Sequence, residues 1–181
     1  DWIKNGKLRL SWGVLGNQDI GDMLFTDQYN ITNVDGGKGY IWAYKGNPEL
    51  TWERTSTIDL GLEFSVGNYV DVEFDYFYKK TDNMLFPRYV APSLGYGGYY
   101  VNDAAMENQG IQFDLKAHLV DTRNVKLDLR LNGGYYRNKM LQMPIDGYDE
   151  NGDEMRMVMS GGMAVGHSTA DWYMVHYEGV N

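Results

Sequence analysis

Strict alternation of apolar and polar residues over long runs is the feature that most constrains the fold of this chain. The clearest run spans residues 57–66, where one parity carries four apolar side chains: Ile58, Leu60, Leu62 and Phe64. The opposite parity carries Thr57, Asp59, Gly61 and Glu63. A period of two places successive side chains on opposite faces of a β-strand. The run therefore predicts one long strand with an apolar face and a polar face.

Four further runs show the same period, at residues 8–14, 70–79, 111–119 and 125–135. In the run that begins at residue 70, Phe77 is an apolar exception on the polar parity. No window shows a persuasive period of 3.6, which an amphipathic helix requires. We therefore predict an all-β fold built on five long antiparallel strands.

The connections between these runs alternate in length. Gly67-Asn68 joins the second and third runs and is a two-residue hairpin signal, and residues 121–124 join the fourth and fifth runs. The other connections are long, at about 16–52, about 81–108 and from about 138 onward. In an up-and-down meander, this alternation places every short turn at one end of the sheet and every long outer loop at the other.

Strand length distinguishes two kinds of sheet. Strands of soluble proteins average about five or six residues, whereas a strand tilted across a bilayer needs about 9–11 residues. Runs of about ten residues with long loops at one end are typical of an outer-membrane β-barrel. The alternative is a soluble sheet or sandwich whose apolar face meets a protein core. Five strands cannot enclose an aqueous lumen, so most of such a barrel would lie outside this sequence.

Composition narrows the function classes. The formal net charge of -9 argues against a nucleic-acid partner, because phosphate binding needs a basic surface. There is no cysteine, which excludes disulfides and thiolate metal sites. No stretch approaches the roughly 18 apolar residues of a membrane-spanning helix.

The residues show no catalytic constellation, and we predict no enzymatic activity, no cofactor and no metal site. The acidic stretch 146–154 invites a calcium interpretation. It fails the EF-hand pattern because, with Asp149 first, Glu154 occupies the position that requires glycine. The stretch is instead predicted to be a turn at Asn151-Gly152.

Five blocks of sequence carry a more specific pattern: LRLSWGVLGNQ at 8–18, NPELTWE at 47–53, the run 55–64, VEFDYFYKKTDNMLF at 72–86 and MENQGIQ at 106–112. In this order and spacing they resemble the barrel domain of SusC/RagA-like TonB-dependent outer-membrane transporters. The last block departs from the family, because Gln109 stands where lysine is usual and Gln112 where glutamate is usual. From residue 138 onward the resemblance is loose.

The resemblance implies that residues 1–181 are a partial C-terminal piece of a transmembrane β-barrel of about 22 strands in the cell outer membrane of a Gram-negative bacterium. The plug domain and the TonB box would lie upstream, and the final strands downstream. The implied function is TonB-dependent import of a nutrient, an oligosaccharide (glycan) or a peptide. The implied partners are a SusD-like surface lipoprotein that forms a lid, the TonB complex and the lipid bilayer.

Two alternatives to this function remain open at the level of sequence. One is a soluble β-sheet module that binds glycans through its aromatic residues. The other is an outer-membrane barrel or adhesin that does not transport.

Two groups of aromatic residues are the candidate site residues. Tyr96, Tyr99 and Tyr100 lie in the predicted outer loop 87–101, where flat rings and hydroxyl groups suit contact with a substrate. The alternative is that this loop packs on its own side chains. A second aromatic set, Tyr40, Trp42 and Tyr44, is predicted to be structural.

Trp52, Tyr76 and Tyr78 are expected at the membrane interface, where a ring with one polar atom suits the headgroup region. The charged residues of the polar parity are expected to face the lumen, where they pair across strands or with a plug, or stay hydrated. They are Asp59, Glu63, Asp71, Glu73, Asp75, Asp114, Lys116, Asp128 and Arg130.

Overall fold

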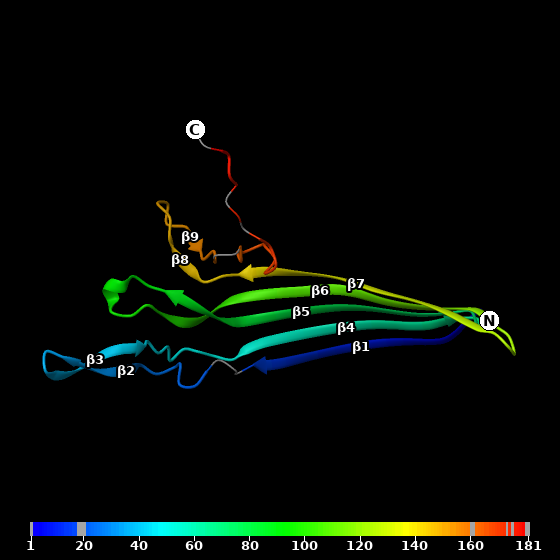
Figure 1. Ribbon diagram of the computed structural model, residues 1–181, viewed down its shortest axis with the longest axis horizontal. Helices are drawn as coiled ribbons and strands as arrows, with labels where there is room; N and C mark the ends of the chain where they lie inside the picture. The colour runs from blue at the N-terminus through cyan, green and yellow to red at the C-terminus, as the bar shows by residue number, and fades with distance from the viewer. Residues whose placement is uncertain (1, 18–20, 160–161, 173, 175, 180–181) are drawn as a thin grey trace. The chain divides into compact units, whose positions relative to one another are not determined.

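The computed structural model describes residues 2–17, 21–159, 162–172, 174 and 176–179. These residues form nine β-strands and one three-residue 3-10 helix, Pro92–Leu94 (Figure 1). The strands are β1 Ile3–Asn17, β2 Gln28–Val34, β3 Gly37–Tyr44, β4 Glu53–Val66, β5 Val70–Tyr89, β6 Gly98–Asp121, β7 Lys126–Gln142, β8 Ile145–Tyr148 and β9 Glu154–Arg156. The all-β prediction is confirmed. Within the described ranges, no helix is long and apolar enough to cross a membrane.

The five long strands form one antiparallel sheet in the order β1-β4-β5-β6-β7 (Figure 1). Each long strand pairs with the next long strand along the chain, so the sheet is the predicted up-and-down meander. The two short connections are residues 67–69 and 122–125, each within one residue of the prediction. In the first, Gly67 has a φ of 58°, which glycine adopts readily, and the Tyr69 amide donates to the Val66 carbonyl at 3.1 Å.

The chain falls into two compact units, each built from three segments. The first, the sheet unit, comprises Asp1–Leu15, Ser56–Lys80 and Glu107–Asn138. The second, the loop unit, comprises Gly16–Thr55, Thr81–Met106 and Lys139–Asn181. The loop unit therefore gathers almost the same residues that the sequence predicts as long connections.

The sheet unit has no hydrophobic core among its described residues. Of the residues that the structure describes in this unit, only Gly61 and Gly110 are buried. The apolar parity is exposed on the long strands, as three examples show: Leu10 is 74 % exposed, Leu60 40 % and Leu129 59 %. Nothing in the described chain covers this row of apolar side chains.

Two glycines of the sheet unit lie under aromatic rings. Phe77, the apolar exception on the polar parity, covers Gly110, where a Cβ atom would lie 2.8 Å from the ring. Phe113 covers Gly133 in the same way, also at 2.8 Å. An aromatic ring over a glycine on the neighbouring strand pins the register of the two strands. Phe77 is thus an exception to the alternation with a structural reason.

The loop unit contains more strand than the sequence predicts. The prediction of a connection over residues 81–108 is wrong for most of its length, because β5 continues to Tyr89 and β6 begins at Gly98. Apolar and polar residues do not alternate cleanly in these extensions. Alternation is expected only where the two faces of a strand have different surroundings. The connection itself is residues 90–97, which include the short helix.

The long connection at 16–52 holds a hairpin of its own, formed by β2 and β3. Its turn residues, Asp35 and Gly36, have φ values of 48° and 81°. Two successive positive φ angles are the signature of the type I′ turn, for which Asp-Gly is a preferred sequence. The register places Tyr29 opposite Trp42 and Ile31 opposite Tyr40.

Methionine dominates the small core of the loop unit. Met140 and Met143 are fully buried, and they pack with the buried residues Phe86 and Ala104. Four further methionines pack against this cluster: Met84, Met106, Met159 and Met163. The unbranched, polarisable thioether fills irregular gaps, which suits a core assembled from two separate segments of the chain.

Candidate functional site

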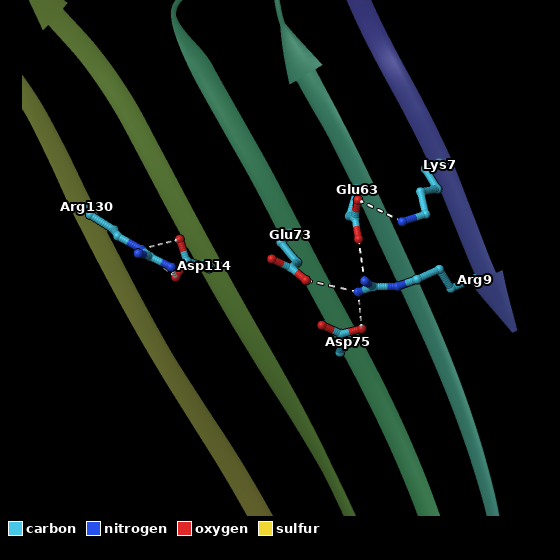
Figure 2. A network of polar contacts seen from close by, with 7 residues as sticks. All are labelled: Lys7, Arg9, Glu63, Glu73, Asp75, Asp114 and Arg130. Atoms are coloured by element: carbon cyan, nitrogen blue, oxygen red, sulfur yellow. Dashed lines mark hydrogen bonds and ion pairs between the residues drawn. The ribbon is translucent and has the colours of Figure 1, made fainter. Parts of the chain in front are cut away.

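The polar face of the sheet unit carries a network of ion pairs across β1, β4 and β5 (Figure 2). Arg9 is its centre: its Nη2 atom donates to Glu73 Oε1 at 3.0 Å and to Asp75 Oδ1 at 2.9 Å, and its Nη1 atom pairs with Glu63. Lys7 Nζ lies 3.5 Å from Glu63 Oε2. The predicted polar parity therefore does form one face, with partners on three strands.

The network continues on β6 and β7. Arg130 donates to both oxygens of Asp114, at 2.8 and 3.0 Å (Figure 2). The His118 ring lies between two carboxylates, 2.7 Å from Asp128 and 3.2 Å from Asp71. Gly61 leaves room for the ion pairs around Arg9, because a Cβ atom at this position would lie only 2.5 Å from Asp75 Oδ1.

These pairs are partly exposed, so solvent screens them and each contributes little to stability. Their geometric role is larger, because cross-strand pairs of opposite charge fix which residues lie side by side. Two open hollows of about 390 and 490 Å³ lie on this face, and Glu73 and Asp114 line both. The polar face can therefore hold water or accept a polar segment.

The opposite face carries two of the residues expected at a membrane interface. The Tyr76 hydroxyl donates to Gln109 Oε1 at 3.4 Å, and the Tyr78 hydroxyl to Glu107 Oε2 at 3.1 Å. All four residues share the parity of Phe74 and Ile111. The third expected residue, Trp52, belongs to the loop unit, where its ring lies against Gly16. The interface role itself stays a prediction.

The loop unit brings the two predicted aromatic sets together. The Trp42 ring lies 5.9 Å from Tyr96, Tyr44 lies 6.3 Å from Tyr100, and Tyr96 lies 6.5 Å from Tyr99, measured between ring centroids. We call Trp42, Tyr44, Tyr96, Tyr99 and Tyr100 the aromatic cluster. Rings at these distances and tilts contact one another, so part of this loop does pack on aromatic side chains.

Two residues of the predicted sets differ from the rest. Tyr40 is 73 % exposed and lies opposite Ile31 on the hairpin, outside the aromatic cluster. Tyr29, which the sequence did not single out, stacks on Trp42 with 4.5 Å between ring centroids. The Asp35-Gly36 turn was the signal that could have identified Tyr29, because a two-residue turn sets the pairing of Tyr29 with Trp42.

A clamp between Asp27 and Lys45 closes the base of the hairpin beside this cluster. Lys45 Nζ donates to both oxygens of Asp27, at 2.9 and 3.1 Å, and the Gly46 amide donates to Asp27 Oδ1 at 2.9 Å. These bonds favour the charged carboxylate, so the Lys45 ammonium, followed by the Gly46 amide, lowers the pKa of Asp27. Gly46 is packed against the Thr26 backbone, which leaves no room for a side chain.

Lys45 also borders an open cavity of about 220 Å³. Its Nζ atom lies 5.0 Å from the centroid of the Trp42 ring, within reach of a cation–π interaction. The remaining walls are Gly46, Asn47, Tyr96 and Tyr99. We call this the aromatic pocket. It combines two tyrosines with a lysine whose charge Asp27 balances, an arrangement that suits an uncharged polar ligand.

The acidic stretch 146–154 forms the β8–β9 hairpin. Asp149 Oδ1 accepts hydrogen bonds from the amides of Asn151 and Asp153, at 2.9 and 2.8 Å. These amides, that of Asp153 first, lower the pKa of Asp149. The predicted turn is confirmed, and Gly152 has a φ of 87°. Within the described ranges, no group of three or more histidine or acidic side chains could hold a metal ion.

Comparison with known families identifies the chain. Residues 1–171 match the family model described as TonB dependent receptor-like, beta-barrel. The chain belongs to this family. Members of the TonB-dependent receptor family are outer-membrane β-barrel proteins, so the recognised sequence blocks and the barrel fold are confirmed and the soluble-sheet alternative is wrong.

Three relatives illustrate the similarity. TonB-dependent receptor P26 of Formosa agariphila is 32 % identical over 142 residues, or 76 % of this chain. TonB-dependent receptor P3 of the same organism is 28 % identical over 81 % of the chain, and TonB-dependent receptor SusC of Bacteroides thetaiotaomicron is 28 % identical over 82 %. The chain covers only 14 %, 15 % and 16 % of their respective lengths.

Solved structures share the fold of this TonB-dependent receptor segment. The structure of the RagAB peptide transporter superposes with a TM-score of 0.69 at 23 % identity, over 88 % of this chain and 19 % of the other. The RagAB peptide importer in its closed-closed state gives 0.68 at 24 % identity, over 79 % and 16 %. An open five-stranded sheet is what one part of such a barrel should look like.

Proposed function

We propose that this chain forms part of the barrel wall of an outer-membrane importer that TonB energises and that takes up an oligosaccharide or a peptide. The observation that carries the proposal is the pair of faces on the sheet unit. The apolar face is exposed, and the polar face carries ion pairs between neighbouring strands. Lipid on one side and a hydrated lumen on the other account for both faces.

The energetics favour lipid over water against the apolar face. Removing a leucine-sized side chain from water is worth about 1.5–3 kcal/mol, and the exposed row runs along all five long strands. Leu8, Leu62 and Leu131 are 71 %, 41 % and 58 % exposed. A row of this length facing water would strongly favour aggregation, whereas hydrocarbon solvates it at no cost.

The aromatic pocket is the proposed contact with the substrate in the outer loops. Tyr96 and Tyr99 are the aromatic residues that line the cavity, and Lys45 supplies an ammonium that Asp27 already neutralises. An uncharged sugar ring stacks well on aromatic rings, so we favour an oligosaccharide over a peptide. The RagAB structures are named as peptide importers, which keeps a peptide as the second candidate.

The proposed partners follow from the relatives that the chain resembles. A SusD-like lipoprotein would cover the loop unit from outside the cell, and the TonB complex would act on a plug domain that this chain does not include. In this mechanism the substrate is captured under the lid, the plug rearranges, and the substrate passes along the polar face. No covalent chemistry takes place.

Uptake by cells that carry the full-length protein tests the proposal. We expect fluorescent neutral oligosaccharides to enter, and entry to stop when TonB is deleted. Tyr96→Ala with Tyr99→Ala should slow uptake about tenfold, because two aromatic contacts of about 0.5–1.5 kcal/mol each are lost. Tyr40→Ala, an exposed tyrosine outside the pocket, is the matched control and should transport normally.

Two outcomes would contradict the proposal. Uptake of neither oligosaccharides nor peptides would favour the non-transporting barrel or adhesin. Entry of peptides alone, unchanged in the Tyr96 and Tyr99 variants, would preserve import but reject the aromatic pocket as a sugar site.

A further inference from the structure

The apolar face of the sheet unit changes character toward the end opposite its short turns. On β5, Phe74 is followed at the same parity by Tyr76, Tyr78 and Lys80. On β7, Leu131 is followed at the same parity by Gly133, Tyr135 and Arg137. On β6, which lies between them, the residues beyond Ile111 are Gln109 and Glu107. Hydrocarbon-like side chains thus give way first to tyrosines and then to charged groups.

The strand register sets the relative levels of these groups on β5, β6 and β7. The hydrogen bond from Tyr78 to Glu107 sets the level of β5 against β6. A Cβ atom at Gly110 would lie 2.6 Å from the Tyr135 carbonyl oxygen, which sets the level of β7. Arg137, two residues beyond Tyr135 on the antiparallel strand, is therefore level with the stretch from Gln109 to Glu107.

Arg137 differs from the cations of the polar face. Lys7, Arg9, Lys116 and Arg130 each pair with a carboxylate. Arg137 is exposed and makes no hydrogen bond or ion pair with any residue that the structure describes. The neighbouring Glu107 carboxylate accepts the Tyr78 hydroxyl instead. The Arg137 guanidinium thus makes no direct pair with a carboxylate among the described residues, and it lies at the parity of the apolar face.

The chemistry of this surface matches one membrane component. Tyrosines mark the headgroup level of a bilayer, and the short turns of such barrels lie on the periplasmic side, so this row faces the outer leaflet. The guanidinium of arginine offers a planar pair of donors that fits two phosphate oxygens. Lysine adds a second cation on a stem long enough to reach the interface.

We propose that Arg137 and Lys80, above the tyrosines of β5 and β7, form a binding surface for the phosphate-bearing headgroup of an outer-leaflet lipid. The occupant is a lipid rather than free phosphate, because the cations stand at the edge of an apolar row that holds acyl chains. This inference rests on the lipid-facing orientation of the apolar face and does not depend on which substrate the protein imports.

Thermal unfolding of the full-length protein in mixed micelles tests the inference. The probe is phosphatidic acid, whose headgroup is a phosphate monoester, added to phosphatidylcholine and neutral detergent. We expect phosphatidic acid to raise Tm of the wild-type protein, and Arg137→Gln with Lys80→Gln to lose at least half of that rise. Lys79→Gln is the matched control, because Lys79 is adjacent in sequence but has the parity of the polar face. It should keep the full rise.

The readouts separate the outcomes. Heat-modifiable electrophoretic mobility verifies that each variant folds. If the double variant does not fold, the Tm of the single variant Arg137→Gln tests the inference. Arg137→Lys should keep part of the rise, since the charge remains without the bidentate geometry. The inference is overturned if phosphatidic acid has no effect on the wild type, if Arg137→Gln leaves the rise unchanged, or if inorganic phosphate at equal concentration produces the same rise. Failure of import in cells would leave the Tm result unaffected, which separates this inference from the proposed function.

Discussion

The sheet unit and the loop unit use their apolar residues in opposite ways. In the sheet unit, Leu10, Leu60 and Leu129 are exposed and nothing described covers them. In the loop unit, Met140 and Met143 are fully buried. The sheet unit thus leaves its apolar side chains exposed to the surroundings, whereas the loop unit buries apolar side chains in a core of its own.

The polar residues show the same contrast. In the sheet unit, charged side chains meet across strands, as Arg9 does with Glu73 and Asp75 (Figure 2). In the loop unit, polar groups hold irregular backbone in place, as Asp27 does with the Gly46 amide. The comparison shows that apolar and polar residues alternate where the two faces of a strand have different surroundings. Where both faces have similar surroundings, the alternation is lost.

The largest effect is expected from placing a charge on the apolar face. Leu60→Arg or Leu62→Arg should cost about 2–4 kcal/mol each in the full-length protein, because arginine at the bilayer midplane on the lipid side is poorly solvated. Barrel assembly, measured by heat-modifiable mobility in outer-membrane fractions, should fall sharply. Asp59→Asn, on the polar face, should be mild. If Asp59→Arg were harmful and Leu60→Arg harmless, the two faces would be inverted.

A smaller and local effect is expected from the methionine core. Met140→Ala should destabilise the loop unit by about 2–5 kcal/mol, because it opens a cavity at a fully buried site. Limited proteolysis of the full-length protein should then cut the outer loops faster while the barrel keeps its heat-modifiable mobility. Met155→Ala, at a residue that is 49 % exposed, is the control and should change little. Loss of the whole barrel in the Met140 variant would show that the two units are not separate in stability.

The smallest effect concerns the pH dependence of the hairpin base. The pKa of Asp27 is lowered by the Lys45 ammonium and then by the Gly46 amide, so the clamp stabilises the hairpin above the ordinary pKa of aspartate. The stabilisation is lost as the pH falls through the lowered pKa, which lies below the ordinary pKa of aspartate. Trp42 fluorescence, isolated by subtracting the Trp42→Phe variant, should report this transition. Asp27→Asn should abolish it, and an unchanged transition in that variant would assign the titration to another group.

The sequence predicted the sheet unit well, for a physical reason. Ile58, Leu60 and Leu62 alternate with polar residues because lipid and lumen select each position independently of distant parts of the chain. The sequence blocks around Trp12 and Asn47 also indicated the protein family. Even the exception at Phe77 became intelligible only once Gly110 was seen beneath its ring.

The candidate site in the loop unit was predicted only in part. Tyr96 and Tyr99 were identified as candidates, but their neighbours Lys45 and Trp42 come from a segment about 50 residues earlier in the chain. No local pattern encodes such a contact. The clamp between Asp27 and Lys45 was missed for the same reason, since an isolated aspartate and lysine carry no periodic signal.

The orientation of the two faces is the central claim, and a labelling scan along β4 tests it most directly. This segment contains no cysteine, so single cysteines at successive positions from 57 to 64 can carry a fluorophore in a full-length protein freed of other cysteines. In vesicles that contain brominated lipid, quenching should be strong at 58, 60, 62 and 64 and weak at 57, 59, 61 and 63. Quenching with the opposite parity, or with no period of two, would contradict the account.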